Sequence, residues 1–200
     1  VGVGVAAGLG VPLGAIAGYY ERWLGEGIMR VADMVFSFPA LLLALVLVTV
    51  MGQSTLNVVV AIGLVYWPVF ARITRGSVLS VKEEDFVQAA RAIGDTDVSI
   101  IFREILPNIV APIIVQATIS LAVAVLVESA LSFLGLGVPP PDPSWGRMLS
   151  QSRGFMQQAP WWVIAPGLAI MFTVLSFNFI GDALRDALDP HQERQLEGRN

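Results

Sequence analysis

The stretch FVQAARAIGDTDVSIIFREILPN, residues 86–108, is a polar insert in an otherwise apolar chain. The sequence on both sides of it consists of long runs of Val, Leu, Ile and Ala. The 200 residues are 55% hydrophobic and only 14% charged, and their mean hydropathy is +0.70. Because soluble domains carry about 25% charged residues, this composition predicts an all-α, polytopic membrane helix bundle with the insert outside the lipid bilayer.

Five segments approach the roughly 20 apolar residues that a helix needs to cross a bilayer. None of them contains Asp, Glu, Lys or Arg, and they are residues 1–20, 34–51, 56–71, 109–127 and 161–180. The chain begins on VGVGVAAGLG, with neither a Met nor a charged leader, as if it entered a helix part-way. We therefore expect a single membrane domain over residues 1–200, truncated at its N-terminus and preceded by a further span.

Positive charge is distributed unevenly between the two sides of this expected bundle. Of the 12 Lys and Arg residues, only Arg147 and Arg153 fall on the side opposite the insert. Loops rich in Lys and Arg remain in the cytoplasm. We therefore expect a cytoplasmic loop at residues 72–108, an external loop at 128–160 and a cytoplasmic tail at 182–200.

The first expected span has a glycine at every fourth position over part of its length. Gly10, Gly14 and Gly18 form this repeat, and Gly4 and Gly8 precede it. Small residues four apart share one helix face and allow another helix to approach closely. We expect that helix to belong to the same chain, and a second subunit is the alternative.

The insert is predicted to form two short helices joined by a glycine. Residues 82–93, KEEDFVQAARAI, are rich in helix formers and begin near acidic residues. Gly94 can adopt positive φ and so end this helix. Asp95 or Thr96 can then cap a second helix that begins near Asp97.

The end of the insert is marked by Leu106 and Pro107. A residue before proline avoids the α region, so a bend is expected at Leu106. The whole insert is either a docking element for another protein, because its turn carries little side-chain bulk, or an ordinary amphipathic loop on the membrane surface.

Several of these residues resemble a known signature. Gln88-Ala89-Ala90, then Gly94, then Leu106-Pro107 are similar to the cytoplasmic signature of the permease subunits of ATP-binding-cassette importers, which reads Glu-Ala-Ala, three residues, Gly, nine residues, Ile, one residue, Leu-Pro. The spacing matches throughout, although Gln88 replaces the Glu and Glu104 replaces the Ile. The runs ESALSFLGLGVPPPDPSWGRML (128–149) and GDALRDALDP (181–190) resemble the peptide and nickel branch, and in particular its C-type permease.

The resemblance implies a type I importer-like fold in the cell (inner or plasma) membrane and a division of labour among subunits. Two permeases form the pathway, ATPase subunits bind ATP and Mg, and an extracytoplasmic binding protein delivers a di- or oligopeptide. This chain would hold no cofactor and catalyse no reaction. By the same resemblance, the ATPase-coupling residues are Gln88, Ala89, Ala90, Gly94, Asp95, Leu106 and Pro107. Nickel or another small solute is the alternative substrate.

Glu128 follows the fourth expected span. A carboxylate near membrane depth is costly and normally faces a cavity, a partner or water. It either caps a helix that begins at Ser129, or belongs with Ser132 and Phe133 to a pathway or gate. In the second case it attracts a peptide amine or pairs with an Arg of a neighbouring subunit.

Other classes of function are disfavoured by the sequence. There is no Cys and one His, His191 in the polar tail, so neither a metal site nor an intramembrane nucleophile is expected. No basic patch with interleaved aromatics indicates nucleic acid, and no phosphate-binding glycine loop indicates ATP on this chain. An ion-coupled secondary transporter is a distant alternative. Such a transporter would carry charged or broken helices at the midplane, whereas the expected spans contain no charged residue.

Overall fold

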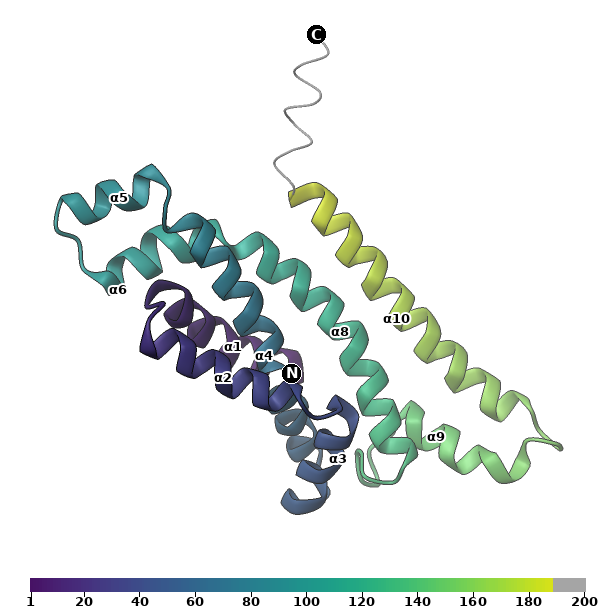
Figure 1. Ribbon diagram of the computed structural model, residues 1–200. Helices are drawn as coiled ribbons and strands as arrows, with labels where there is room; N and C mark the ends of the chain where they lie inside the picture. The colour runs from purple at the N-terminus through teal and green to yellow at the C-terminus, as the bar shows by residue number, and fades with distance from the viewer. Residues whose placement is uncertain (189–200) are drawn as a thin grey trace, which may run out of the picture.

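The computed structural model describes residues 1–188, and these are helical apart from short connections. Within the described residues, four helices are each long and apolar enough to cross a bilayer: α1 (Gly2–Tyr19), α4 (Thr55–Val81), α8 (Val110–Phe133) and α10 (Trp161–Leu188). A bent pair, Trp23–Phe36 with Ala40–Met51, is long and apolar enough when its two helices are taken together. α10 lies along α8 in Figure 1. The expected all-α membrane bundle is confirmed. His191 and the rest of the expected tail beyond residue 188 lie outside the described residues.

Shorter helices connect the long ones. They are α2 (Trp23–Phe36), α3 (Ala40–Met51), α5 (Asp85–Ala92), α6 (Asp97–Ser99), the π-helix η1 (Ile100–Ile105), α7 (Leu106–Asn108), α9 (Trp145–Ser152) and the 3₁₀ turn η2 (Arg153–Phe155). In Figure 1, α5 and α6 project from one end of the bundle, and α9 lies near the other end of α8. The polar insert is therefore a separate projection at one end of the membrane helices.

The expected span at residues 34–51 is not one straight helix. α2 ends at Phe36, α3 begins at Ala40, and the two are bent by 90°. α3 has 12 residues, about 18 Å of helix, which is too short to cross a hydrocarbon core of about 30 Å. Pro39 accounts for the break, because it has no N–H to donate and disfavours helical backbone at the residue before it.

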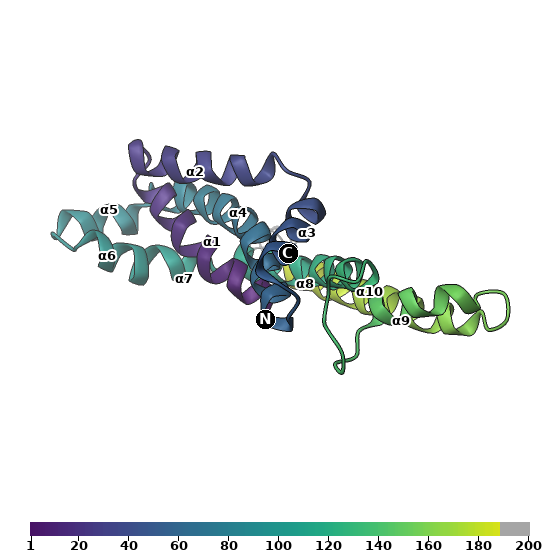
Figure 2. The same cartoon turned by 90° about the horizontal axis from the view of Figure 1, so that it is seen from below.

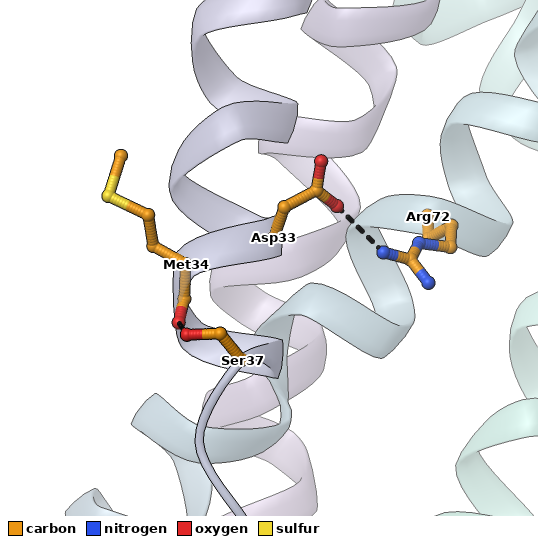
Figure 3. Close-up of polar contacts among 4 residues, drawn as sticks. All are labelled: Asp33, Met34, Ser37 and Arg72. Atoms are coloured by element: carbon orange, nitrogen blue, oxygen red, sulfur yellow. Dashed lines mark hydrogen bonds and ion pairs between the residues drawn. The ribbon is translucent and has the colours of Figure 1, made fainter.

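Arg72 of α4 holds the last turn of α2 just before this bend. Its Nη2 donates to Oδ1 of Asp33 at 2.8 Å, and its guanidinium lies 4.5 Å from the centroid of the Phe36 ring. Figure 3 shows this ion pair beside the hydrogen bond from Ser37 Oγ to the Met34 carbonyl, 2.6 Å long. Both charged side chains are about half exposed, so the ion pair contributes at most about 1 kcal/mol and mainly fixes where α2 ends.

α1 and α4 pack against each other in parallel. Three glycines of α1 face successive turns of α4, and these pairs are Gly10 with Phe70, Gly14 with Thr74 and Gly18 with Val78. The residue numbers rise together in the two helices, so α1 and α4 run in the same direction. The intervening α2 and α3 must therefore bring the chain back to the end of the bundle where α1 begins. Figure 2 shows α2 alongside α1 and α4. The prediction that the glycine face packs within this chain is confirmed.

Candidate functional site

The projection formed by α5, α6 and η1 turns at a glycine. α5 ends at Ala92, and Gly94 follows with φ +84°, in the left-handed region that favours glycine. Oδ1 of Asp95 accepts from the backbone N–H of Thr96 at 2.9 Å, and Oγ1 of Thr96 accepts from the backbone N–H of Ser99 at 3.3 Å. The predicted geometry, two short helices joined by a glycine with a capped second helix, is confirmed, but the first helix begins at Asp85 and not at Lys82, which is the C-cap residue of α4.

One face of the projection is buried against the long helices. Its aliphatic side chains form a single cluster with α1 and α4, made of Ala15, Val78, Val87, Ala90, Ile100, Ile101, Ile105 and Ile109. Complete burial of an aliphatic side chain is worth about 1.5–3 kcal/mol, so several such residues bind the projection firmly. The projection is therefore a fixed extension of α1 and α4.

Polar contacts from the end of α1 add to this attachment. The hydroxyls of Tyr19 and Tyr20 donate to the two carboxylate oxygens of Asp97 at 2.7 Å and 2.9 Å. These bonds hold the pKa of the Asp97 carboxyl below its ordinary value, and the same contact raises the pKa of Tyr20. Lys82 at the end of α4 forms an ion pair with Glu21. We call the three residues Tyr19, Tyr20 and Asp97 the tyrosine clamp.

Sequence reasoning did not find the tyrosine clamp. Its members are 77 and 78 residues apart, and no local pattern joins them. The one available signal was a pair of adjacent tyrosines at the end of an apolar span, which is also typical of ordinary anchoring at a membrane interface.

The projection also exposes apolar residues, which lie among exposed charged ones. We call Ala89, Ile93, Gly94, Val98 and Phe102 the outward face. Ile93 is 84% exposed, Val98 63% and Phe102 65%. Gln88 lies beside this face, and its Nε2 donates to the carbonyl of Lys82 at 3.0 Å. A glutamate could not donate this bond, so the departure from the signature at this position adds a contact to the end of α4.

The expected bend at Leu106 is wrong. Leu106 has helical backbone, with φ −56° and ψ −43°, and it packs against the buried cluster. Pro107 falls in the first turn of α7, where its missing N–H costs nothing. The preceding segment, Ile100–Ile105, is a π-helix, and the backbone first departs from helical values at Ile109, with φ −110° and ψ 11°.

Glu128, Ser132 and Phe133 lie at the end of α8 farthest from the projection. Oε1 of Glu128 accepts from Oγ of Ser132 at 2.6 Å and from Oγ of Ser144 at 3.0 Å. α8 runs through Glu128 to Phe133, so the alternative that Glu128 caps a helix beginning at Ser129 is wrong. The guanidinium of Arg153 lies over the Phe133 ring, with its central carbon 3.8 Å from the ring centroid. The structure thus joins Glu128 with Ser132 and places Phe133 in a separate contact.

Comparison with known proteins identifies similar sequences along almost the whole chain. Residues 10–194 match the family described as binding-protein-dependent transport system inner membrane component. The chain is 52% identical over 181 residues to the dipeptide transport system permease protein DppC of Alkalihalophilus pseudofirmus, covering 90% of this chain and 60% of that protein. It is 46% identical over 186 residues to the glutathione transport system permease protein GsiD of Escherichia coli, covering 93% and 61%. The chain therefore spans about 60% of the length of these relatives.

Solved structures show the same arrangement of helices. The structure is similar to a chain of the MetNI methionine ABC transporter in an inward-facing conformation, with a TM-score of 0.76 over 94% of this chain and 89% of that one. A second crystal form of the same transporter gives a TM-score of 0.78. The sequences are 18% and 17% identical, so this likeness shows the fold, which is that of a type I importer-like permease.

Proposed function

The chain belongs to the family of binding-protein-dependent transport system inner membrane components, and on that premise we propose that it is a permease subunit of an ATP-driven importer of di- or oligopeptides. The two relatives compared above are named for dipeptide and for glutathione transport, and glutathione is itself a peptide. These names favour a peptide over nickel or another small solute as the substrate.

In this proposal the projection lies in the cytoplasm and its outward face docks into a groove of an ATPase subunit. Gln88, Ala89, Ala90, Gly94 and Asp95 lie at or beside the docking turn, and Leu106-Pro107 lead from it into α8. ATP and Mg bind to the ATPase subunits. A second permease subunit and an extracytoplasmic binding protein complete the transporter, and the distribution of Lys and Arg supports this orientation.

In this proposal, the attachment of the projection passes movement to the membrane helices. A partner shifts a conformational equilibrium only if it binds one state more tightly than the other. The outward face offers that partner an exposed apolar surface, while the buried cluster and the tyrosine clamp tie the opposite face to α1 and α4. Movement of the docked ATPase would therefore move both helices together.

One observation carries this proposal: an exposed apolar turn is held from behind by buried contacts to two membrane helices. An amphipathic loop resting on lipid, the other interpretation, would place Ile93 and Phe102 in the membrane. Asp95 and Asp97 lie in the same short turn, and burial of carboxylates at that depth is costly. A docked protein accommodates both kinds of side chain more readily.

The test is purification of the full-length protein from its native membrane in mild detergent, followed by mass spectrometry and reconstitution into liposomes. We expect an ATPase subunit and a second permease to copurify, and ATP to be required for uptake of labelled dialanine once the binding protein is added. Recovery of this chain alone, with uptake that needs no ATP, would replace the proposal with a secondary transporter.

A further inference from the structure

Two cavities meet at Glu128, at the end of α8 that carries α9. One cavity has a volume of about 430 Å³ and is lined by Glu128, Val138, Pro143, Ser144, Trp145 and Met148. The other, of about 310 Å³, lies among the first turns of α1 and α4, the second half of α8 and the middle of α10, and Glu128, Val138 and Trp145 line it as well. Among the described residues, Glu128 has the one charged side chain that lines either cavity.

The carboxylate of Glu128 is held in a fixed position. Ser132, one turn further along α8, and Ser144, at the start of α9, both donate to its Oε1. α9 is seated closely on α8, because a side chain at Gly146 would meet the carbonyl carbon of Ser129 at 2.7 Å. Ser144 is therefore positioned by helix packing, and the two hydroxyls present the carboxylate to the cavities.

The second oxygen of Glu128 is left available for a ligand. Over residues 1–188, Oε2 makes no hydrogen bond and Glu128 forms no ion pair. Ligand sites are typically concave and mostly apolar, with a few polar groups that fix orientation. A carboxylate beside an aromatic ring suits a cation, because the carboxylate supplies a charge-assisted hydrogen bond and the ring face attracts positive charge.

From this geometry we propose that Glu128 binds the free ammonium group of the peptide in transit, with Ser132 and Ser144 as positioning residues and Trp145 beside the cation. This inference rests on the proposed function. Dipeptides and glutathione both carry a free α-ammonium group, so the site reads a feature that the substrates named for both relatives share. It assigns to this chain a part in selecting peptides with an unblocked amine.

The proposal is tested on the full-length transporter in nanodiscs, labelled with 5-fluorotryptophan, without the binding protein. The ¹⁹F resonance of Trp145 is assigned with Trp145→Phe, and the sample is titrated with dialanine, N-acetyl-dialanine and n-propylammonium. We expect dialanine and n-propylammonium to shift this resonance and N-acetyl-dialanine to leave it unchanged. Glu128→Gln should weaken the response to dialanine by about tenfold or more, as loss of a charge-assisted hydrogen bond does.

Two further variants separate a specific site from general attraction by negative charge. Gln at position 128 can still accept from both serines, so Glu128→Gln preserves the local packing. Glu128→Asp keeps the charge and should retain part of the response. Asp142→Asn removes a carboxylate from the same external loop that lines neither cavity, and it should bind dialanine as the unchanged protein does.

The outcomes distinguish the inference from the proposed function. An equal response to the acetylated peptide, an unchanged response in Glu128→Gln, or an equal loss in Asp142→Asn would each overturn the ammonium site, even if the transporter imports peptides. Absence of ATP-driven peptide uptake would overturn the proposed function. In that case the n-propylammonium titration would still decide whether Glu128 binds an ammonium group.

Discussion

Gly14→Ala provides a direct test of the close packing between α1 and α4. The added Cβ would lie 2.8 Å from Cβ of Thr74 and 2.9 Å from Cα of Ala71, and closer still to the Ala71 carbonyl oxygen. Carbon atoms pack favourably at about 3.5–4.0 Å, so the helices must separate by roughly 1 Å. Overpacking of this kind costs about 1–3 kcal/mol, which is offset in part by up to about 1 kcal/mol from the better helix propensity of alanine.

Gly8→Ala is the matched control, because it lies in the same helix and its Cβ would meet nothing within 4 Å. It gains the propensity of alanine without the clash, so the difference between the two variants isolates the close approach. SDS titration of the full-length proteins, followed by circular dichroism, measures both free energies of unfolding. We expect Gly14→Ala to be less stable than Gly8→Ala by about 1–3 kcal/mol. Equal stability of the two variants would refute the packing argument.

Three further predictions concern the projection. Gly94→Val places a β-branched residue at φ +84°, at a cost of at least about 1–2 kcal/mol. It should lower the ratio of peptide imported to ATP hydrolysed without reducing membrane insertion, and Gly94→Asn should restore much of that ratio. An unchanged ratio in the Val variant would contradict the role of the turn. Tyr20→Phe removes a donor that, with Tyr19, lowers the pKa of Asp97. The variant should be less stable than the unchanged protein by about 0.5 kcal/mol at neutral pH, and this difference should vanish as the pH falls through the lowered pKa of Asp97. Thermal unfolding at a series of pH values measures the difference, and a difference that does not depend on pH would count against the clamp. The 200 residues contain no Cys, so a single cysteine introduced by Ile93→Cys or by Asp142→Cys can be labelled with an impermeant maleimide. We expect Asp142→Cys to react from outside the cell and Ile93→Cys only in inverted vesicles. The reverse pattern would show that the protein has the opposite orientation in the membrane.

Local features of the fold could be predicted from the sequence because they depend on neighbouring residues. The turn at Gly94 between two helices, the cap at Thr96 and the glycine face of α1 each follow from backbone sterics or helical periodicity. The break at Pro39 had the same kind of signal. It was obscured by the continuous apolar composition of residues 34–51, since hydropathy measures length and ignores whether a helix is straight.

The parts that the sequence could not predict depend on contacts between distant segments. The tyrosine clamp joins the end of α1 to a turn almost 80 residues later, and Ser144 reaches Glu128 across a loop. The prediction for Leu106 failed for a different reason. The general preference before proline is weak enough for the packing of Leu106 in the buried cluster to override it.

The π-helix Ile100–Ile105 lies between the turn at Gly94 and α8. Each residue of an α-helix advances the chain by about 100°, and a π-helix accommodates an additional residue within a turn. Loss of one residue from this segment would restore α-helical hydrogen bonding and leave the projection facing nearly the same way, because the wider turn already accommodates the additional residue. Loss of one residue from α8 would instead rotate everything before it by about 100°, so that Ile93, Val98 and Phe102 would keep their chemistry and point in a new direction. Lengths as well as residue types therefore determine which way the projection faces its partner.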